Sequence, residues 1–165
     1  MNRMEKQKKV FEKLDELKLN YKVIHHPAAY TIEQMDDLGI TNLDDVCKNL
    51  FLRDYKGKRH FIVVLDKDKH VDLKKMREQM GTTALSFASE ERLEKYLQLS
   101  KGAVTPFGII NDTDCVVEVV FDQDLVGKNS LGFHPNENTA TVWVSFDDIK
   151  KVIQQNGNKI TYVTI

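Results

Sequence analysis

Two short apolar runs constrain the fold of this chain more than any other feature of its sequence. Residues 61–65 read FIVVL and residues 115–121 read CVVEVVF, and both are rich in the β-branched residues that favour strands. The first run predicts the second strand of a hairpin that begins with residues 46–53 and turns at 55–58. The second run is apolar almost throughout, and it therefore predicts a central strand of a sheet.

The rest of the chain alternates between strand and helix patterns. Further strands are predicted at residues 21–25, 84–87, 124–127, 139–144 and 159–164, and helices at 3–18, 31–38, 71–80, 89–99 and 147–155. About seven strands interspersed with helices, without a regular βαβ alternation, predict an α+β fold with a mixed, curved sheet flanked by helices. The length suits a single domain that spans residues 1–165.

Composition excludes several classes of protein. The chain is 41% hydrophobic and 30% charged, as is usual for a soluble domain, and it has no apolar run long enough to cross a membrane. The first ten residues, MNRMEKQKKV, are charged and lead into no apolar stretch, so they are not a secretion signal. Cys47 and Cys115 lie far apart and form no CxxC pair. These features predict a reduced, cytoplasmic protein that does not associate with membranes.

Charge is unevenly distributed along a nearly neutral chain. The net charge is −1, so there is no global basic surface for a polyanion. Residues 48–75 nevertheless contain nine Lys or Arg and four Asp, whereas residues 111–150 contain two Lys and eight Asp or Glu. A basic face could bind nucleic acid locally, but solvated lysines around loops explain the same counts, and charge alone favours that second interpretation.

Lys48 is the strongest single signal in the sequence. Read with a period of two, the run VCKNLFLRD places Lys48 on the same face as Leu50 and Leu52. The opposite face carries Asn49 and Arg53 and is predicted to be the more solvated one. Because an unpaired ammonium in an apolar interior costs several kcal/mol, Lys48 either extends to the rim of the sheet or lines a pocket that binds a phosphate or carboxylate.

Two glycine- and proline-containing loops are further candidates. In the loop GAVTP, Gly102 permits a backbone conformation that exposes N–H groups to a ligand, and Pro106 limits the flexibility of the loop. His134 lies between Phe133 and Pro135 in a loop before a strand, where it could form a hydrogen bond in a cleft near neutral pH. Taken singly, each segment is also compatible with a plain connection or a surface histidine.

Other chemistry finds no support in the sequence. Adjacent residues of a strand point to opposite faces, so His25 and His26 do not form a metal site, and no Cys, His and Asp cluster has ligand spacing. Cys47 lies on the face opposite Lys48 and Cys115 lies in an apolar run, so neither is a supported nucleophile. The motifs GxSxG, GxGxxG and the phosphate-binding P-loop are absent. We therefore expect neither a metal nor a cofactor.

Four stretches in combination resemble a known family. HHPAAYTIEQ, VCKNLFLRD, KGAVTPFGIIND and GFHPNENTATVWVSFDDIKKVI, in this order, are similar to the YbaK/ProX family of aminoacyl-tRNA deacylases. The closest resemblance is to its stand-alone ProX type (PrdX in some members), which is related to the editing domain of bacterial prolyl-tRNA synthetase. The resemblance covers nearly the whole chain, and it is specific because the strand lysine, the GxxxP loop and the GxHP loop occur together.

The resemblance implies a metal-free cleft and assigns residues to it. The implied catalytic residues are Lys48, which meets the 3′ end of the acylated tRNA, together with Gly102 and His134. The implied substrate-binding residues are Tyr30, Asn49, Ala103, Val104, Thr105, Pro106 and Phe133.

The resemblance also implies a reaction and a partner. A water molecule attacks the ester between the amino acid and the terminal ribose, and the neighbouring 2′-hydroxyl of the substrate assists it. The implied substrate is the 3′ end of tRNA(Pro) mischarged with alanine, and prolyl-tRNA synthetase or an elongation factor is a further expected partner. Two alternatives stay open: a cysteinyl-tRNA(Pro) deacylase of the YbaK type, and a non-catalytic sensor of aminoacyl-tRNA ends.

Overall fold

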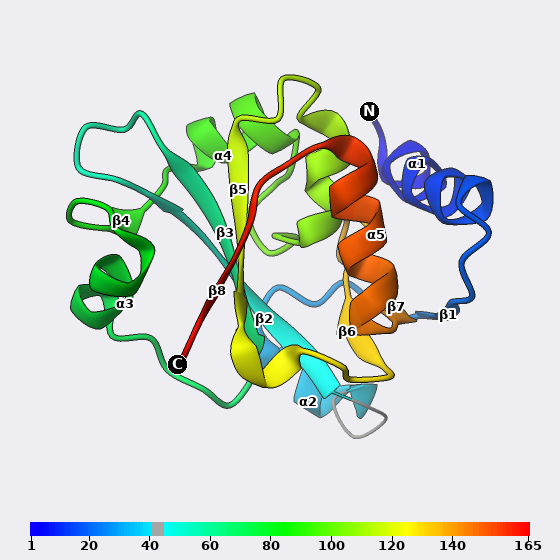
Figure 1. Ribbon diagram of the computed structural model, residues 1–165. Helices are drawn as coiled ribbons and strands as arrows, with labels where there is room; N and C mark the ends of the chain where they lie inside the picture. Colours follow the sequence, from blue (N-terminus) through cyan, green and yellow to red (C-terminus); the bar gives the residue numbers. More distant parts are fainter. Residues whose placement is uncertain (41–44) are drawn as a thin grey trace.

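The computed structural model describes residues 1–40 and 45–165 and has an α+β fold built on one mixed sheet (Figure 1). The strands hydrogen-bond in the order β1-β7-β6-β2-β3-β5-β8, and β4 pairs with β2 outside this path. Their bounds are β1 Lys22–His25, β2 Asp45–Arg53, β3 His60–Asp66, β4 Ser86–Phe87, β5 Val117–Asp122, β6 Leu131–Phe133, β7 Ala140–Val144 and β8 Ile160–Val163. The predicted fold class is confirmed, with eight strands where about seven were expected.

The helices begin and end at the signals that the sequence carries. Their bounds are α1 Arg3–Glu16, α2 Ile32–Asp37, α3 Leu73–Met80, α4 Glu90–Leu97 and α5 Phe146–Asn156, with 3₁₀ helices η2 Pro106–Asn111 and η3 Gln123–Leu125. Asp72 caps α3 by accepting hydrogen bonds from two backbone N–H groups, and Ser89 caps α4. Gly81 and Gly157, both left-handed, end α3 and α5.

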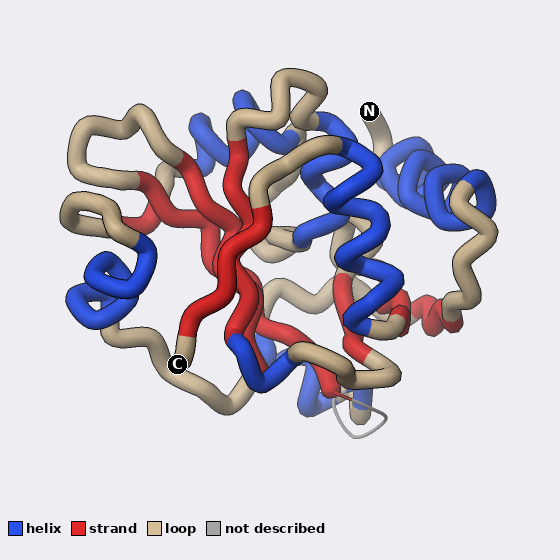
Figure 2. Tube along the Cα trace, in the orientation of Figure 1, coloured by secondary structure: helices blue, strands red, loops and turns tan. Residues whose placement is uncertain are grey.

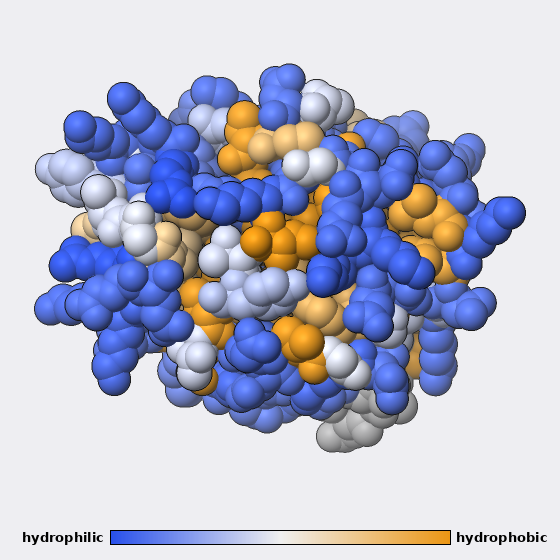
Figure 3. Space-filling model, viewed as in Figure 1, coloured by the Kyte–Doolittle hydropathy of each residue, from blue (hydrophilic) through white to orange (hydrophobic). Residues whose placement is uncertain are grey.

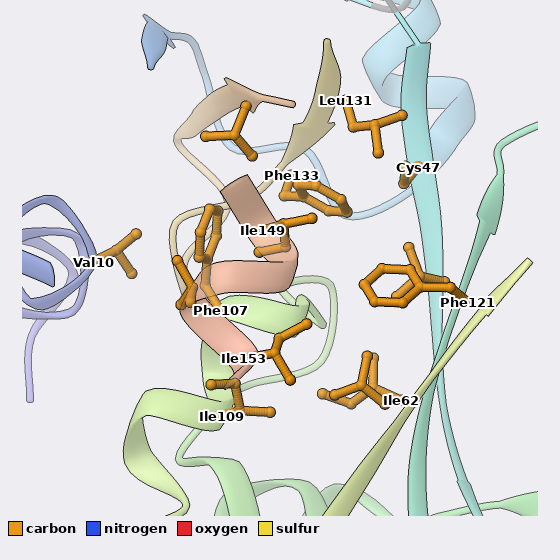
Figure 4. Close-up of a cluster of buried hydrophobic side chains, with 14 of the residues drawn as sticks. Val10, Cys47, Ile62, Phe107, Ile109, Phe121, Leu131, Phe133, Ile149 and Ile153 are labelled. Atoms are coloured by element: carbon orange, nitrogen blue, oxygen red, sulfur yellow. The ribbon is translucent and has the colours of Figure 1, made fainter. Parts of the chain in front are cut away.

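Helices cover both faces of the sheet, as the tube in Figure 2 shows. The larger core lies between one face and the helices α1, α4, η2 and α5, and Figure 4 shows side chains of α5 and η2 directed at the strands. The smaller core lies on the other face, where Met76 of α3 packs with strand residues such as Leu52. Along β3 the side chains alternate between the two cores, and so all but the last residue of this strand are buried.

This arrangement overturns the prediction of a solvated face on β2. Cys47 and Phe51 belong to the larger core, and Leu52 on the opposite face belongs to the smaller one. The prediction is wrong because β2 is an interior strand: β3 and β6 flank it, and helices cover both of its faces. The polar residues Asn49 and Arg53 are only partly buried, so the helices do not cover β2 completely at these two positions.

Two predictions near residues 123–133 are also wrong. The expected strand at 124–127 is replaced by η3, because the carboxylate of Asp122 accepts the N–H of Asp124 and caps a 3₁₀ turn. The expected loop around Gly132 begins instead with strand β6, which pairs antiparallel with β7. A three-residue strand with a central glycine has no readable alternation.

The prediction that Cys115 lies in a central strand is also wrong. β5 begins at Val117, and Cys115 precedes it in a turn with a φ of 55°. Its thiol donates to the carbonyl of Asn156, 3.0 Å away. The apolar run of the sequence therefore starts before the strand does.

The visible surface in Figure 3 is mostly hydrophilic, and its apolar side chains gather in the middle, near β8 and α5. No helix in residues 1–40 or 45–165 is both long and apolar enough to cross a membrane.

Candidate active site

The candidate site lies where the sheet divides. Among the described residues, β2 and β6 pair in parallel only through Asp45 with Leu131 and Val46 with Gly132. Beyond this short ladder β2 continues as the partner of β3, while β6 continues with β7. A cavity of about 210 Å³ opens here. It is lined by residues 46–49 of β2, by Gly132 and Phe133 of β6, and by His134, which follows β6.

The structure brings most of the predicted site residues to this cavity. Those that line it are Tyr30, Lys48, Asn49, Gly102, Val104, Phe133 and His134. Ala103 lines a neighbouring cavity instead. Thr105 and Pro106 are buried at the start of η2 and line neither of these two cavities; the Thr105 hydroxyl accepts the N–H of Phe107 at 3.3 Å. These two buried residues therefore support the loop but do not line the cavities.

Lys48 supplies the positive charge of the cavity. Its side chain is partly buried, and its ammonium donates a hydrogen bond to the backbone carbonyl of Lys69. In the described part of the chain no carboxylate forms an ion pair with it. An ammonium has three donors, so two remain for an anionic or carbonyl ligand.

The loop before η2 supplies backbone donors. Gly102 has a φ of 84°, a left-handed conformation that favours glycine. The N–H of Ala103 is already bonded to the carbonyl of Ser100 at 3.1 Å. Gly102 and Val104 line the cavity, and within residues 1–40 and 45–165 their N–H groups have no acceptor. These two amides can therefore bind a ligand oxygen.

His134 presents a neutral imidazole. Its Nδ1–H donates to the carbonyl of Ala140 at 2.9 Å, which leaves Nε2 as an acceptor. Burial lowers the pKa of His134 below its ordinary value, so the ring stays neutral at physiological pH. The ring of His26 lies 6.1 Å away; it bonds to the carbonyl of Pro27 and to the hydroxyl of Thr141.

Asn49 contributes an acceptor that has no donor. Its Oδ1 is buried and has no hydrogen-bond partner in the described residues. An unpaired buried acceptor costs about 1–3 kcal/mol, which a ligand with an N–H or O–H group would recover.

Sequence reasoning missed several residues of the wall: Thr31, Ile32, Met35, Val46, Cys47, Gly132 and Thr141. The alternation of β2 gave no sign that both of its faces reach the cavity. For Gly132 the signal was the glycine of the GxHP loop. The structure gives the reason for a glycine at this position: a Cβ there would lie 3.0 Å from Nε1 of Trp143. Burial raises the pKa of the Cys47 thiol strongly, so this thiol is not an activated nucleophile.

The site therefore combines a cation, two backbone donors, a neutral histidine and an orphan acceptor. Among the described residues, no group of three or more His, Cys, Asp or Glu is arranged to hold a metal ion. The hydroxyl of Thr141, which lines the cavity, lies 2.9 Å from Nε2 of His26. Such a site can orient an ester and stabilise negative charge on its oxygen while water attacks.

Comparisons with known proteins identify the family of this chain. Residues 26–152 match the family described as the aminoacyl-tRNA editing domain. The prolyl-tRNA editing protein ProX of Acetoanaerobium sticklandii is 54% identical over 155 residues, covering 94% of each chain. The prolyl-tRNA synthetase associated domain-containing protein 1 of Mus musculus is 31% identical over 152 residues, covering 89% of each. A crystal structure of a proposed trans-editing enzyme for prolyl-tRNA synthetase superposes with a TM-score of 0.70 at 19% identity, covering 97% of both chains.

Proposed function

Because this chain belongs to the aminoacyl-tRNA editing domain family, we propose that it is a trans-editing deacylase that hydrolyses alanine from mischarged tRNA(Pro). The observation that carries the proposal is the convergence of Lys48, the loop at Gly102 and His134 on one cavity. Lys48 and Gly102 lie more than fifty residues apart in the sequence, and Gly102 and His134 lie about thirty residues apart. Residues 1–165 act in this proposal as one deacylase domain.

Lys48 and the loop amides have separate roles in the proposed reaction. The ammonium of Lys48 binds the phosphate of the terminal nucleotide, and its hydrogen bond to the backbone carbonyl of Lys69 fixes its position. The N–H groups of Gly102 and Val104 bind the ester carbonyl oxygen and stabilise the negative charge that develops on it. Removing one such donor in other enzymes costs about 10²–10³-fold in rate.

The bond changes require no nucleophilic side chain. Water adds to the ester carbonyl carbon, and the neighbouring 2′-hydroxyl of the substrate orients it. The tetrahedral intermediate then collapses, the bond between the acyl carbon and the ribose oxygen breaks, and the ribose oxygen takes up the proton that the attacking water has lost. The neutral Nε2 of His134 accepts a hydrogen bond from the attacking water or the 2′-hydroxyl, and Oδ1 of Asn49 accepts one from the α-amino group.

The cavity offers apolar surface to the side chain of the amino acid. Its volume is about 210 Å³, and Ile32, Met35 and Phe133 contribute apolar surface to its wall. A single methylene changes discrimination by only about 1–3 kcal/mol, so alanine and cysteine are separated by close packing and not by charge. The family resemblance favours alanine. The proposed partner is the 3′ end of tRNA(Pro), with prolyl-tRNA synthetase or an elongation factor as a further partner, and the proposed location is the cytoplasm.

A deacylation time course tests the proposal. Alanyl-, cysteinyl- and prolyl-tRNA(Pro) are each mixed with substoichiometric protein, and the remaining ester is followed. We expect multiple turnovers on the alanine ester only. Lys48→Ala should abolish turnover, whereas Lys151→Ala, on the exposed side of α5, should leave it unchanged.

Other outcomes would replace the proposal. Preferred turnover of the cysteine ester would identify a deacylase of the YbaK type. Binding of all three tRNAs without turnover would identify a sensor of aminoacyl-tRNA ends. Full activity of Lys48→Ala would remove Lys48 from the catalytic machinery.

A further inference from the structure

A second cavity, of about 410 Å³, adjoins the first. Tyr30 lines both cavities. The loop before η2 alternates between them: Gly102 and Val104 line the first cavity, whereas Lys101 and Ala103 line the second. An extended chain whose end occupies the first cavity can therefore pass Tyr30 and enter the second.

The second cavity is positively charged. Arg3 and Lys6 of α1 line it together with Lys101. In residues 1–40 and 45–165 neither Arg3 nor Lys6 has a carboxylate partner. Lys101 lies 3.9 Å from Glu90, but both side chains are more than 70% exposed, so this contact holds Lys101 weakly. Three weakly engaged cations around one hollow favour a phosphate ligand.

Glu137 is the acidic residue of this wall, and both of its carboxylate oxygens already accept hydrogen bonds. Its carboxylate accepts hydrogen bonds from the side-chain amide of Gln7 and from the backbone N–H of Thr139, the latter at 3.0 Å. The bond to Gln7 also ties α1 to the loop after β6. This bond fixes the position of α1, and the helix in turn holds Arg3 and Lys6 at the cavity.

Asn136 supplies an acceptor without a donor. It lines the second cavity, is 1% exposed, and its buried Oδ1 has no hydrogen-bond partner among the described residues. Its φ of 63° is left-handed, a conformation that asparagine adopts more readily than most residues. A buried amide oxygen that no protein group satisfies points to a ligand that donates a hydrogen bond.

We propose that the second cavity binds the nucleotide that precedes the terminal adenosine of the tRNA 3′ end. This inference rests on the proposed function, because it requires the aminoacylated adenosine to occupy the first cavity. Arg3, Lys6 and Lys101 bind, together with Lys48, the phosphodiester that joins the two nucleotides, and Oδ1 of Asn136 accepts a hydrogen bond from the base amino group or the ribose 2′-hydroxyl. Tyr30, 55% exposed, offers its ring to the base between the two cavities.

The test compares substrates that differ by one nucleotide. Hydrolysis of 3′-alanyl-adenosine is measured beside hydrolysis of the same ester on the dinucleotide cytidylyl-(3′→5′)-adenosine and on whole tRNA(Pro). We expect kcat/KM of the wild-type protein to rise at least about tenfold from the nucleoside to the dinucleotide, the equivalent of one good charged contact. Lys6→Ala and Asn136→Gly should each lower this ratio about fivefold or more, while hydrolysis of alanyl-adenosine stays at the wild-type rate.

Controls separate binding from folding and from another path. Glycine tolerates the left-handed backbone at residue 136, and urea unfolding of each variant shows whether the fold is kept. Phe87→Ala is the matched control, because Phe87 is 64% exposed and lines a different hollow beside Gly102. Lys6→Ala should also reduce the dependence of log KM on log salt concentration for the dinucleotide by about 0.7.

The outcomes distinguish this inference from the proposed function. If the wild-type protein hydrolyses none of the three esters, the proposed function fails. If it hydrolyses them but gains nothing from the second nucleotide, or if Lys6→Ala and Asn136→Gly keep the wild-type ratio, the second cavity is not the subsite. A selective loss in Phe87→Ala would overturn it in favour of the hollow at Phe87.

Discussion

Gly102 packs directly beneath Tyr30. A Cβ atom at residue 102 would lie 2.7 Å from Cδ1 of Tyr30 and 3.2 Å from its Cα, closer than side chains approach one another. The loop before η2 and the segment before α2 thus meet with no space for a side chain. This contact sets the boundary between the two cavities, and Tyr30 lines both of them.

Gly102→Ala should therefore lower both stability and activity. Residue 102 has a φ of 84°, so alanine pays the left-handed cost and also displaces Tyr30. Gly127→Ala is a matched control, since Gly127 has a φ of 82° but no described heavy atom lies within 4 Å of the place that its Cβ would take. We expect losses in urea unfolding of about 1 kcal/mol for Gly127→Ala and about 2–3 kcal/mol for Gly102→Ala, and at least a tenfold loss of deacylation only in the latter. Equal losses in both variants would contradict a role for the Tyr30 contact.

Lys48→Met should separate activity from stability. Methionine keeps the length of the side chain and removes the partly buried ammonium, which has only the Lys69 carbonyl as its partner in the described residues. We expect deacylation to fall about 10²-fold or more while the free energy of unfolding stays within about 1 kcal/mol of wild type.

Lys69→Met is the contrasting variant. Its ammonium lies 2.6 Å from the carboxylate of Asp122, which is 1% exposed, so its removal leaves a buried charge unpaired. This should cost about 3 kcal/mol in unfolding free energy. If Lys48→Met proved as destabilising as Lys69→Met, Lys48 would be a structural residue.

His60 should make stability depend on pH. Burial, and next the charge of Arg92, lower the pKa of His60 to about 4, and Nη1 of Arg92 lies 3.0 Å from its Nε2. The unfolded chain takes up this proton near pH 6.5 but the folded protein only near pH 4, so stability is lost as the pH falls through this range. By pH 4 this difference in pKa has lowered the free energy of unfolding by about 3 kcal/mol. His134, whose pKa is also lowered, acts in the same direction.

The measurement is urea unfolding of wild type and His60→Gln at pH 7, 5 and 4. Glutamine can still accept from Arg92 but does not titrate, so the curve of the variant should be shallower. His25→Gln, at an exposed position of β1, controls for the loss of a histidine. Parallel curves for wild type and His60→Gln would contradict the assignment.

Asn158 should contribute strongly to stability, although it does not line the candidate site. Its Nδ2 donates to the carboxylate of Asp112 and to the carbonyl of Val117, both at 2.8 Å, and all of this is buried. Asn158→Ala leaves a buried carbonyl and a buried carboxylate short of a donor, which should cost about 2–4 kcal/mol in urea unfolding. Asn129→Ala, at an exposed loop position, should cost less than about 0.5 kcal/mol. A loss below 1 kcal/mol for Asn158→Ala would mean that water replaces the amide.

Local signals predicted the elements well. Asp72 and Gly81 bound α3, and FIVVL forms the inner strand β3, because caps and alternation act within a few residues. Errors arose where a tertiary contact decides: Asn49 and Arg53 suggested a solvated face, yet helices far along the chain cover that face of β2. β6 was missed because its strand character depends on pairing with β7.

The sequence by itself determined the residue types of the site. A lysine on an apolar strand, a glycine–proline loop and a histidine before proline are all visible in the chain, and the resemblance they support named a cleft. Only the tertiary structure decided that β2 leaves β6 after Val46, so that both faces of β2 reach the cavity and Tyr30 closes onto Gly102. Local sequence sets dihedral and burial preferences over a few residues, whereas a cavity is the space left when segments distant in sequence pack against one another.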